Sequence, residues 1–312
     1  MTTYCITGVS GYVGRLLAAK LLEQPGARVV GVDQTPPAGL DGARFHRCDI
    51  RDPRLADILR DEAVDTLIHL AFYTAPEGDA ALAESVNVGG TRNVLEAAGA
   101  AGVKRLVLAS STAAYGSHPD NPVPMREDAP LRPNRAFYYS WHKAEQERLA
   151  AEFQQGHPAV KVAVLRPCVL IGPHINNPTG ASLRQKILVY IKGDATPIQM
   201  IHEDDAVEAF RLAATGEAVG IFNVAGGKTL TYPDIARTLG KKIVLLPFGL
   251  LAALATLGKW LRVSPVSATT LQFIRHPIVA DGSKFAAAFG FVPQYSVHQA
   301  LEDFAGITPS SH

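Results

Sequence analysis

Short apolar runs alternate with longer amphipathic segments through the first half of the chain. The runs lack regular polar positions, which is typical of strands that are buried on both faces of a parallel sheet. The longer segments repeat apolar residues at intervals of three and four, which predicts helices. Strands are predicted at 3–7, 28–33, 44–50, 65–71, 104–110 and 160–166, and helices at 12–23, 53–62, 82–101 and 138–153. This alternation predicts an α/β fold with a doubly wound parallel sheet.

The alternation breaks after Arg166, where Pro167, Gly172 and the segment 176–180 indicate loops. Beyond this point the pattern predicts a helix at 182–191, a strand at 198–202, a helix at 204–214, a strand at 221–225 and a helix that starts at Thr231. We therefore expect a smaller, mostly C-terminal α/β lobe, inserted between elements that return to the main sheet.

One uncharged apolar run, from Ile243 to Leu257, stands out in the second half. It is shorter than the roughly 20 residues that a membrane-spanning helix needs, and Pro247 interrupts it. We predict no membrane span here, but a strand followed by a helix that is buried or faces a partner. The alternative is a helix that faces lipid or a hydrophobic substrate. The apolar character continues to Leu261.

Composition narrows the possible functions of the 312-residue chain. Apolar residues make up 47% and charged residues 19%, which excludes a disordered chain. The formal net charge of +1 argues against a nucleic-acid partner and against a polybasic membrane signal. Cys5, Cys48 and Cys168 are scattered and the ten histidines have no metal-ligand spacing, so we expect reduced thiols and no metal site. The N-terminus lacks a signal-peptide pattern, and we expect a cytoplasmic protein.

A glycine-rich loop follows the first predicted strand and opens the first predicted helix. It reads TGVSGYVG and places glycines at 8, 11 and 14. Glycine lets the backbone approach a pyrophosphate closely, and a helix N-terminus offers free N–H groups and a positive dipole to an anion. The spacing is G-x-x-G-x-x-G rather than the dinucleotide fingerprint G-x-G-x-x-G, so the strand–loop–helix context carries the prediction.

Asp33 lies at the end of the second predicted strand. A carboxylate at this place can accept hydrogen bonds from both ribose hydroxyls of adenosine, and it would repel a 2′-phosphate. The next residues, Gln34 and Thr35, supply no arginine that would reverse this preference. The sequence therefore predicts NAD rather than NADP as the cofactor.

Tyr139 and Lys143 are four residues apart in a helical segment, which places both side chains on one face. A tyrosine with an ordinary pKa of about 10 is a poor base at neutral pH, but a nearby ammonium group favours its phenolate form. Ser110, Ser111 and Thr112 lie at the end of the predicted strand 104–110, and doubly wound sheets bind ligands at the carboxyl ends of their strands. A hydroxyl there can hold a substrate carbonyl or alcohol while Tyr139 moves the proton. We therefore interpret Tyr139, Lys143 and one of these three hydroxyls as catalytic groups.

Together these motifs closely resemble those of the extended short-chain dehydrogenase/reductase family, in the NAD-dependent epimerase/dehydratase branch that includes the UDP-glucose 4-epimerases. Further segments extend the resemblance over nearly the whole chain: CDIRD, LIHLA, NVGGTRNVLEAA, SSTAAYG, YSWHK, LRPCVLIGP, HEDDAVEAF and FNVAGG. The resemblance implies an NAD-binding Rossmann domain at 1–166, completed by about 203–227 and nearby C-terminal segments. It also implies a substrate-binding lobe made of 167–202 and 228–312.

The resemblance implies roles for individual residues as well. Tyr139 matches the catalytic acid/base, Lys143 matches its partner that also holds the nicotinamide ribose, and Ser111 matches the catalytic Ser/Thr. The implied cofactor-binding residues are Gly8, Gly11, Tyr12, Val13, Gly14, Asp33, Asp49, Ile50, Leu70, Ala71, Tyr139, Lys143, Pro167, Cys168 and Val169. The implied substrate contacts are Phe72, Thr112, His174, Asn177 and His202.

Departures from the family pattern bear on the substrate. The 4,6-dehydratases carry an Asp–Glu pair directly after the catalytic Ser/Thr, where this chain has Thr112 and Ala113, so dehydration is not expected. Many nucleotide-sugar enzymes hold the diphosphate with an arginine in the strand before the H-x-D-D segment, where this chain has Gln199 and Met200. Basic residues that could serve instead are Arg184, Lys186, Lys192 and Arg275. The bulk of Phe72 and the apolar lobe favour a smaller or more hydrophobic substrate.

The resemblance implies hydride transfer between NAD and a secondary alcohol or ketone. Epimerisation of a sugar or nucleotide sugar is the first expectation, because it is the commonest activity of the branch. Dehydrogenation or ketone reduction of a smaller or hydrophobic alcohol is the alternative, and a non-catalytic NAD-sensing regulator is the alternative of another class. The branch commonly forms dimers through two helices of each subunit, which here are 82–101 and 138–153, so we expect a homodimer.

Overall fold

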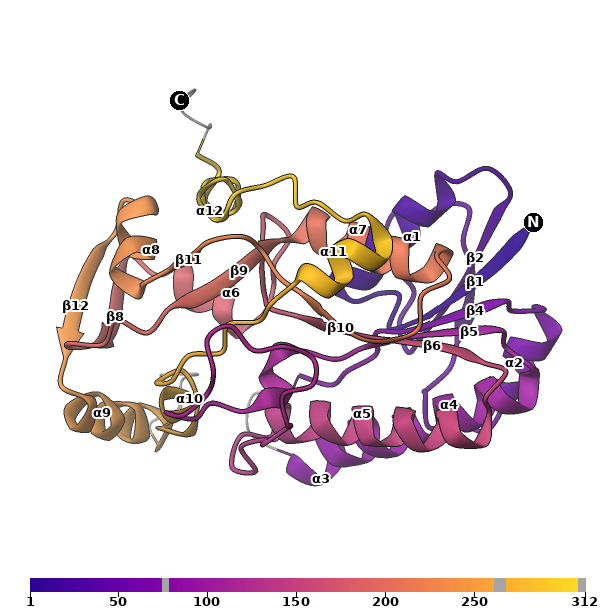
Figure 1. Ribbon diagram of the computed structural model, residues 1–312, viewed down its shortest axis with the longest axis horizontal. Coiled ribbons are helices and arrows are strands. Elements are labelled where there is room, and N and C mark those ends of the chain that lie inside the picture. The colour runs from indigo at the N-terminus through magenta and orange to yellow at the C-terminus, as the bar shows by residue number, and fades with distance from the viewer. Residues whose placement is uncertain (75–78, 261–267, 308–312) are drawn as a thin grey trace.

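A computed structural model describes residues 1–74, 79–260 and 268–307. Its centre is a seven-stranded sheet with the strand order β10-β6-β5-β4-β1-β2-β3, in which all neighbours are parallel (Figure 1). The strands are β1 (Thr2–Thr7), β2 (Ala27–Asp33), β3 (Arg44–Arg47), β4 (Thr66–His69), β5 (Arg105–Ala109), β6 (Lys161–Pro167) and β10 (Gly220–Val224). Each strand predicted in the first half of the chain is therefore confirmed, with ends shifted by a few residues.

Helices cover both faces of this sheet. They are α1 (Tyr12–Leu22), α2 (Leu55–Asp61), α4 (Gly90–Ala101), α5 (Tyr138–Gly156), α7 (Glu203–Thr215) and α11 (Ser283–Phe289). The apolar sides of α1, α7 and α11 form one core with one face of the sheet, and those of α2, α4 and α5 form a second core with the other face (Figure 1). The doubly wound parallel sheet predicted from the apolar runs is confirmed.

The predicted helix at 82–101 is present but contains one wider turn. The short α3 (Ala80–Glu84) continues into a π-helical turn (Ser85–Gly89), which continues into α4. The wider turn buries Asn87 completely, and the Asn87 amide exchanges two hydrogen bonds with the backbone of Tyr73. π-Helical turns are frequent at functional sites. This one fixes the loop after β4.

A second group of elements lies at one end of the main sheet (Figure 1). Its strands are β7 (Val169–Ile171), β9 (Ile198–His202) and β11 (Thr229–Leu230), which form one small sheet, and β8 (Ile187–Ile191) and β12 (Lys242–Leu246), which form a parallel pair. Its helices are α6 (Pro178–Leu183), α8 (Tyr232–Thr238), α9 (Phe248–Trp260), α10 (Ala268–Phe273) and α12 (Val297–Ala305). The helix predicted to start at Thr231 is confirmed as α8, where Thr231 and Asp234 form a capping box.

The helix predicted at 182–191 is wrong. The short α6 ends early in this region, and the remainder forms β8. Side-chain exposure alternates along β8, from 51% at Ile187 to 1% at Leu188, 43% at Val189 and 2% at Tyr190. This alternation of exposure is that of a strand paired on one edge with β12, and the unbroken apolar run ILVYI did not distinguish a strand from a helix.

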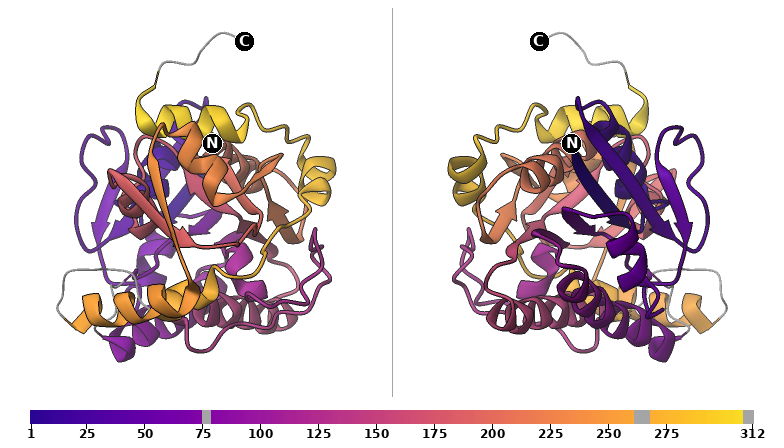
Figure 2. Two further views of the ribbon diagram at one scale, coloured as in Figure 1. Left: turned by 90° about the vertical axis from the view of Figure 1, so that its left-hand side faces the viewer. Right: turned by 90° about the vertical axis from the view of Figure 1, so that its right-hand side faces the viewer.

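The apolar run at 243–257 forms a strand and a helix, β12 and α9, as predicted. Leu261, at the end of the apolar stretch, lies outside the described residues. Within the part of the chain that the structure describes, no helix is long and apolar enough to cross a bilayer. Elements β8, β12 and α9 together form one end of the molecule, which faces the viewer in the left panel of Figure 2.

Candidate active site

Two glycines of the loop after β1 are packed directly against other backbone atoms. Gly8 has a φ of +78°, and a Cβ added there would lie 2.6 Å from the amide nitrogen of Ala71. A Cβ at Gly14 would lie 2.2 Å from the carbonyl oxygen of Gly8, and one at Gly11 would lie 3.1 Å from it. The loop therefore closes tightly over the end of β4, and side chains at Gly8 or Gly14 would open it.

The same loop leaves the N-terminus of α1 without a side-chain cap in the described structure. Val13 packs into the core beneath α1, and Leu70 packs against the same core from the loop after β4. An uncapped helix start keeps its first N–H groups available for an anion.

Two carboxylates lie at the carboxyl end of β2 and just beyond β3. Asp33 Oδ2 accepts from the Ser10 amide at 3.0 Å, so it fixes the glycine loop, and its Oδ1 accepts from the Gln34 amide at 2.7 Å. The Gln34 side chain donates in turn to Asp49 at 3.2 Å. The guanidinium of Arg51 bonds Asp49 and lowers the pKa of that carboxyl. Asp33 and Asp49, both predicted as cofactor-binding residues, are thus joined through one glutamine.

Ser111 and Tyr139 meet at the carboxyl end of β5, where their side chains share a hydrogen bond. Ser111 caps the 3₁₀ turn Thr112–Tyr115, and its Oγ accepts from the Ala113 amide at 3.2 Å. The turn is tied to α5 because Ser140 Oγ donates to the Ala113 carbonyl at 2.7 Å. This link sets the distance between the start of α5 and the end of β5.

Aromatic rings surround Tyr139. The edge of its ring contacts Phe72 with the centroids 5.1 Å apart, and Phe137 lies 6.1 Å away on the other side. Phe137 in turn packs on Phe273 of α10 at 4.4 Å. Burial in this surrounding raises the pKa of Tyr139, and the hydrogen bond with Ser111 opposes the shift. In the protein alone, Tyr139 is therefore held in its neutral form at pH 7.

Lys143 is buried one turn further along α5. Its Nζ donates to the Ala109 carbonyl at 2.6 Å and to Gln146 Oε1 at 3.0 Å. The same atom lies 4.1 Å from the ring centroid of Phe72 and 6.0 Å from that of Tyr139. Burial lowers the pKa of Lys143 to about 7, against an opposing effect of Glu147. The predicted catalytic residues are thus brought together, and Phe72 contacts both the lysine and the tyrosine.

A buried polar chain behind Lys143 was not predicted from the sequence. Gln146 Nε2 donates to Thr91 Oγ1 at 2.7 Å, and Thr91 Oγ1 lies 2.9 Å from His69 Nε2. The other ring nitrogen of His69 lies 2.7 Å from Thr7 Oγ1, and burial lowers the pKa of His69 to about 3. His69 is therefore a neutral structural residue. The position of Gln146, three residues after Lys143 on one helix, was the available sequence signal.

Glu203 is a second residue that the sequence interpretation missed. It is 1% exposed and lies at the start of α7, where its carboxylate accepts from the Tyr12 hydroxyl and from the His174 backbone amide. The His174 ring also bonds this carboxylate through Nδ1. Burial and the hydrogen bond to Glu203 raise the pKa of Tyr12. The structure thus joins the glycine loop to the loop after β7, and it places Tyr12 and His174 on one carboxylate.

Two other predicted substrate residues hold helix starts. Asn177 caps α6, with its side chain accepting from the Gly180 amide at 3.1 Å. His202 caps α7 and is 1% exposed; its Nδ1 accepts from the Asp204 amide at 3.1 Å. The remaining nitrogen of His202 lies 2.9 Å from Asp303, and its ring stacks on Tyr295. Both ring nitrogens of His202 are therefore engaged within the protein.

The segment after β6 joins the main sheet to β7. The Cys168 amide donates to the Val224 carbonyl at 2.9 Å, and burial raises the pKa of the Cys168 thiol to about 12. Pro167 ends β6 and Val169, 37% exposed, begins β7. The three thiols of Cys5, Cys48 and Cys168 are all free and buried.

The strand that carries an arginine in many nucleotide-sugar enzymes is β9. Its Gln199 is buried, and its amide exchanges hydrogen bonds with the backbone of Ala280 at 2.9 and 3.0 Å. Met200 is 3% exposed. Gln199 therefore anchors the chain before α11. Predicted residues that are also buried near the site are Ile50 and Thr112.

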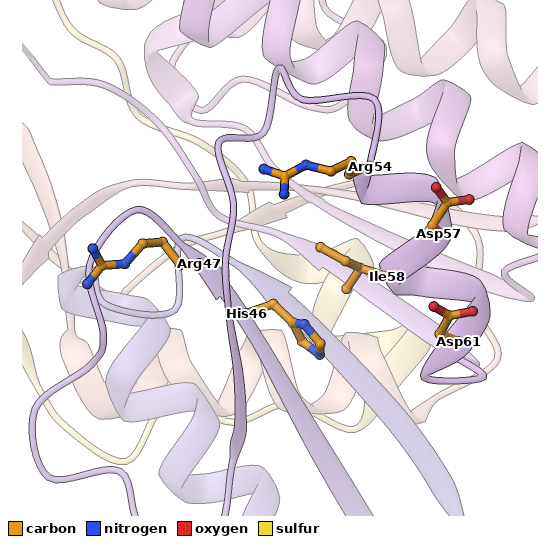
Figure 3. Close-up of a pocket in the computed structure, with 6 residues that line it drawn as sticks. All are labelled: His46, Arg47, Arg54, Asp57, Ile58 and Asp61. Atoms are coloured by element: carbon orange, nitrogen blue, oxygen red, sulfur yellow. The ribbon is translucent and has the colours of Figure 1, made fainter.

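A separate surface hollow of about 320 Å³ lies between β3 and α2 (Figure 3). Its lining residues are His46, Arg47, Arg54, Asp57, Ile58 and Asp61. They carry both signs of charge, and they differ from all of the predicted site residues.

The chain is similar to proteins of known family. Residues 4–225 match the model of the NAD-dependent epimerase/dehydratase family. An uncharacterised protein of Mycobacterium bovis is 28% identical over 318 residues, which cover 97% of this chain and 84% of that protein.

Two solved structures illustrate the range of enzymes with this fold. The UDP-glucose 4-epimerase of Thermotoga maritima with UDP-glucose has a TM-score of 0.79 at 21% identity, over 98% of both chains. DesIV, a dTDP-glucose 4,6-dehydratase from Streptomyces venezuelae with NAD, has a TM-score of 0.77 at 24% identity, over 98% of this chain and 96% of that one. These similarities show the Rossmann-type fold. Because the family model covers more than half of the sequence, the protein belongs to the NAD-dependent epimerase/dehydratase family, and NAD is its cofactor.

Proposed function

We propose that the protein is an oxidoreductase that uses NAD, Ser111, Tyr139 and Lys143 to transfer a hydride at a secondary alcohol or ketone. The observation that carries the proposal is the hydrogen bond between Ser111 and Tyr139 at the carboxyl end of β5, beside buried Lys143. Ligands of doubly wound sheets bind at this edge.

The glycine loop fits a dinucleotide. Gly8 and Gly14 keep the loop closed, α1 begins without a side-chain cap, and Asp33 ends β2 beside the loop. The pyrophosphate would bind at the start of α1, and Asp33 would accept from the adenosine ribose. Bound NAD supplies the group that accepts and returns the hydride.

The three catalytic side chains divide the proton chemistry among themselves. Ser111 donates to the substrate oxygen and keeps it beside Tyr139. Tyr139 takes the hydroxyl proton when the alcohol is oxidised and returns it when the ketone is reduced. Its raised pKa must fall for this role, and the ammonium group of Lys143 is the protein's means of lowering it. Gln146 and the Ala109 carbonyl hold that ammonium in place.

Epimerisation of a sugar or nucleotide sugar is the reaction that we propose first. The Thermotoga maritima enzyme of the same fold is a UDP-glucose 4-epimerase. The second candidate is dehydrogenation or ketone reduction of a smaller or hydrophobic alcohol, which is favoured by buried Gln199 on β9 and by Phe72 beside Tyr139. The fold does not argue against dehydration, because the dehydratase DesIV shares it. What disfavours dehydration is that Thr112 and Ala113 stand where the 4,6-dehydratases carry an Asp–Glu pair.

The experiment mixes the protein, NAD and candidate alcohols, sugars and nucleotide sugars, and follows NADH absorbance and product identity. Sugar interconversion without net NADH supports the epimerase, and net NADH supports the dehydrogenase. NAD binding without turnover of any candidate substrate supports the alternative of a non-catalytic, NAD-sensing regulator. For any turnover found, Tyr139→Phe should lower kcat by about 10²–10⁴-fold, with NAD still bound. Tyr138→Phe is the matched control on the same helix. Unchanged turnover in Tyr139→Phe would refute the mechanism.

A further inference from the structure

We propose that one end of the molecule binds the surface of a bilayer that contains anionic phospholipids. This docking end consists of the exposed side of α9, with Leu250, Leu254 and Leu257, and the outer face of the β8–β12 pair, with Ile187, Val189 and Val244. It is independent of the proposed catalytic activity.

Helix α9 is apolar on both sides. Leu251 and Ala255 point inward and are 9% and 6% exposed. Leu250, Leu254 and Leu257 lie on the other side at helical spacing, and each keeps about half of its surface exposed, 50%, 48% and 51%. An ordinary surface helix carries polar residues on its outer side. Because residues 248–258 contain no charged side chain, transfer of the outer side of α9 from water into an apolar environment is favourable.

The neighbouring strands add a second apolar surface. In the parallel pair, Ile187 lies opposite Lys242 and Val189 lies opposite Val244, so these side chains share one face. Ile187, Val189 and Val244 are 51%, 43% and 42% exposed. The strands and α9 occupy the same end of the molecule in both figures that display the ribbon (Figures 1 and 2). Exposed apolar side chains gathered at one end of a molecule mark an interaction site.

The charge of this region identifies the partner. The sequence contains no Asp or Glu from 235 to 280, although the whole chain is nearly neutral. Exposed basic residues flank the two strands, Lys186 and Lys192 at the ends of β8 and Lys242 at the start of β12, while the nearby Asp234 is already paired with Arg237. The Arg275 guanidinium lies 4.7 Å from the ring centroid of Phe248, at the start of α9. Apolar side chains bordered by basic groups are the pattern that binds anionic lipid surfaces.

A second copy of the chain fits this end less well. A two-fold dimer would place the docking end against itself. The exposed Lys186, Lys192 and Lys242 of one copy would then face those of the other, and Asp234 is already paired with Arg237. A bilayer supplies phosphates at the rim and hydrocarbon at the centre. Since α9 has 13 residues, it can lie along the membrane–water interface but is too short to span the bilayer.

The test uses the full-length protein and sedimentation with two kinds of vesicle, phosphatidylcholine alone and phosphatidylcholine with phosphatidylglycerol. We expect binding to the phosphatidylglycerol vesicles that weakens as salt is raised, because the basic residues contribute through screened charge. Replacing Leu250, Leu254 and Leu257 by Gln should lower the vesicle-bound to free ratio by about tenfold or more. Val219 and Val292 lie outside the docking end and are 55% and 68% exposed. Replacing both by Gln is the matched control.

Thermal unfolding checks that each variant is folded. If the variant with all three leucines replaced does not fold, the single variant Leu254→Gln takes its place. Three results would overturn the proposal. The wild-type protein could fail to bind phosphatidylglycerol vesicles at low salt. The folded leucine variant could bind as well as the wild type. The leucine changes could instead convert a dimer to a monomer, which would assign this end to a subunit contact.

Discussion

Gly8 shows how one residue's surroundings decide what the backbone tolerates. It combines a positive φ with a backbone neighbour from the loop after β4, so it is needed for two separate reasons. Gly39 also has a positive φ, +67°, but a Cβ there would meet nothing within 4 Å. The two positions therefore separate the conformational cost of a side chain from its steric cost.

Gly8→Ala should lower the free energy of unfolding by about 2–4 kcal/mol, since a strained φ and a clash with Ala71 add together. It should also weaken NAD binding at least tenfold, because the loop must open to relieve the clash. Gly39→Ala should cost only about 1 kcal/mol and leave NAD binding unchanged. Chemical denaturation and calorimetric titration with NAD measure both effects. Equal losses in the two variants would contradict the packing argument.

Single residues of the candidate site could be predicted only where the signal was local. The four-residue spacing was sufficient to propose Tyr139 and Lys143, whereas the position after a strand left Ser110, Ser111 and Thr112 open until the family resemblance indicated Ser111. The contact of Tyr12 with Glu203 joins positions 191 residues apart, and no periodicity or motif encodes it. The buried carboxylate became visible only when the start of α7 was packed beside α1.

A buried ion pair joins α5 to β6. Arg166 and Glu147 are 2% and 4% exposed at their side chains, and their closest atoms are 2.6 Å apart. Ser110 Oγ donates to the same carboxylate, and Arg166 Nη1 donates to the Tyr115 hydroxyl at 2.7 Å. Glu147 lies one turn after Lys143, so the pair fixes the turn of α5 that carries Lys143.

Glu147→Leu alone should lower the free energy of unfolding by about 3–5 kcal/mol, because it leaves the Arg166 charge buried and unpaired. Adding Arg166→Met should recover most of that loss, since a buried pair replaced by apolar residues of similar size is often neutral. Urea denaturation of the two single variants and the double variant gives the coupling directly. Additive losses would mean that the two side chains do not stabilise each other.

Elements were predictable from sequence to the extent that one period dominated each segment. The buried parallel strands gave unbroken apolar runs, and the flanking helices gave clear three-and-four spacing. Residues 187–191 are mostly apolar, so a helix and a strand both fit that run, and only pairing with β12 selects the strand. The π-helical turn at Asn87 depends on the contact with Tyr73, which local propensity does not contain.

The whole molecule has a charge distribution that its composition conceals. The net charge of +1 is a sum over the whole chain, and it hides the fact that residues 235–280 include basic residues but no acidic ones. The sequence argument against a polybasic membrane signal used only this net charge of the whole chain. The arrangement in space matters because β8 and β12 bring the exposed Lys186, Lys192 and Lys242 to the end of the molecule that α9 also forms (Figure 1).

The homodimer stays a prediction at this scale, and α4 and α5 are where it would form. Both helices lie on one face of the sheet, and their outer sides carry exposed Ala100 and Ala151 among charged residues. Arg148 is already paired with Glu145 and Glu152 along α5, so its charge is compensated before any contact forms. Small residues between compensated charges allow two copies of such helices to approach closely.

Light scattering should give a mass about twice the 33.3 kDa of the chain. Ala151→Glu places a new carboxylate beside Glu152 in each copy, and two-fold symmetry would bring these charges close together, so dimer dissociation should rise at least tenfold. Ala287→Glu makes the same change at an exposed position of α11, across the sheet, and should leave the mass unchanged. A monomeric wild type, or equal behaviour of both variants, would remove α4 and α5 from consideration as the interface.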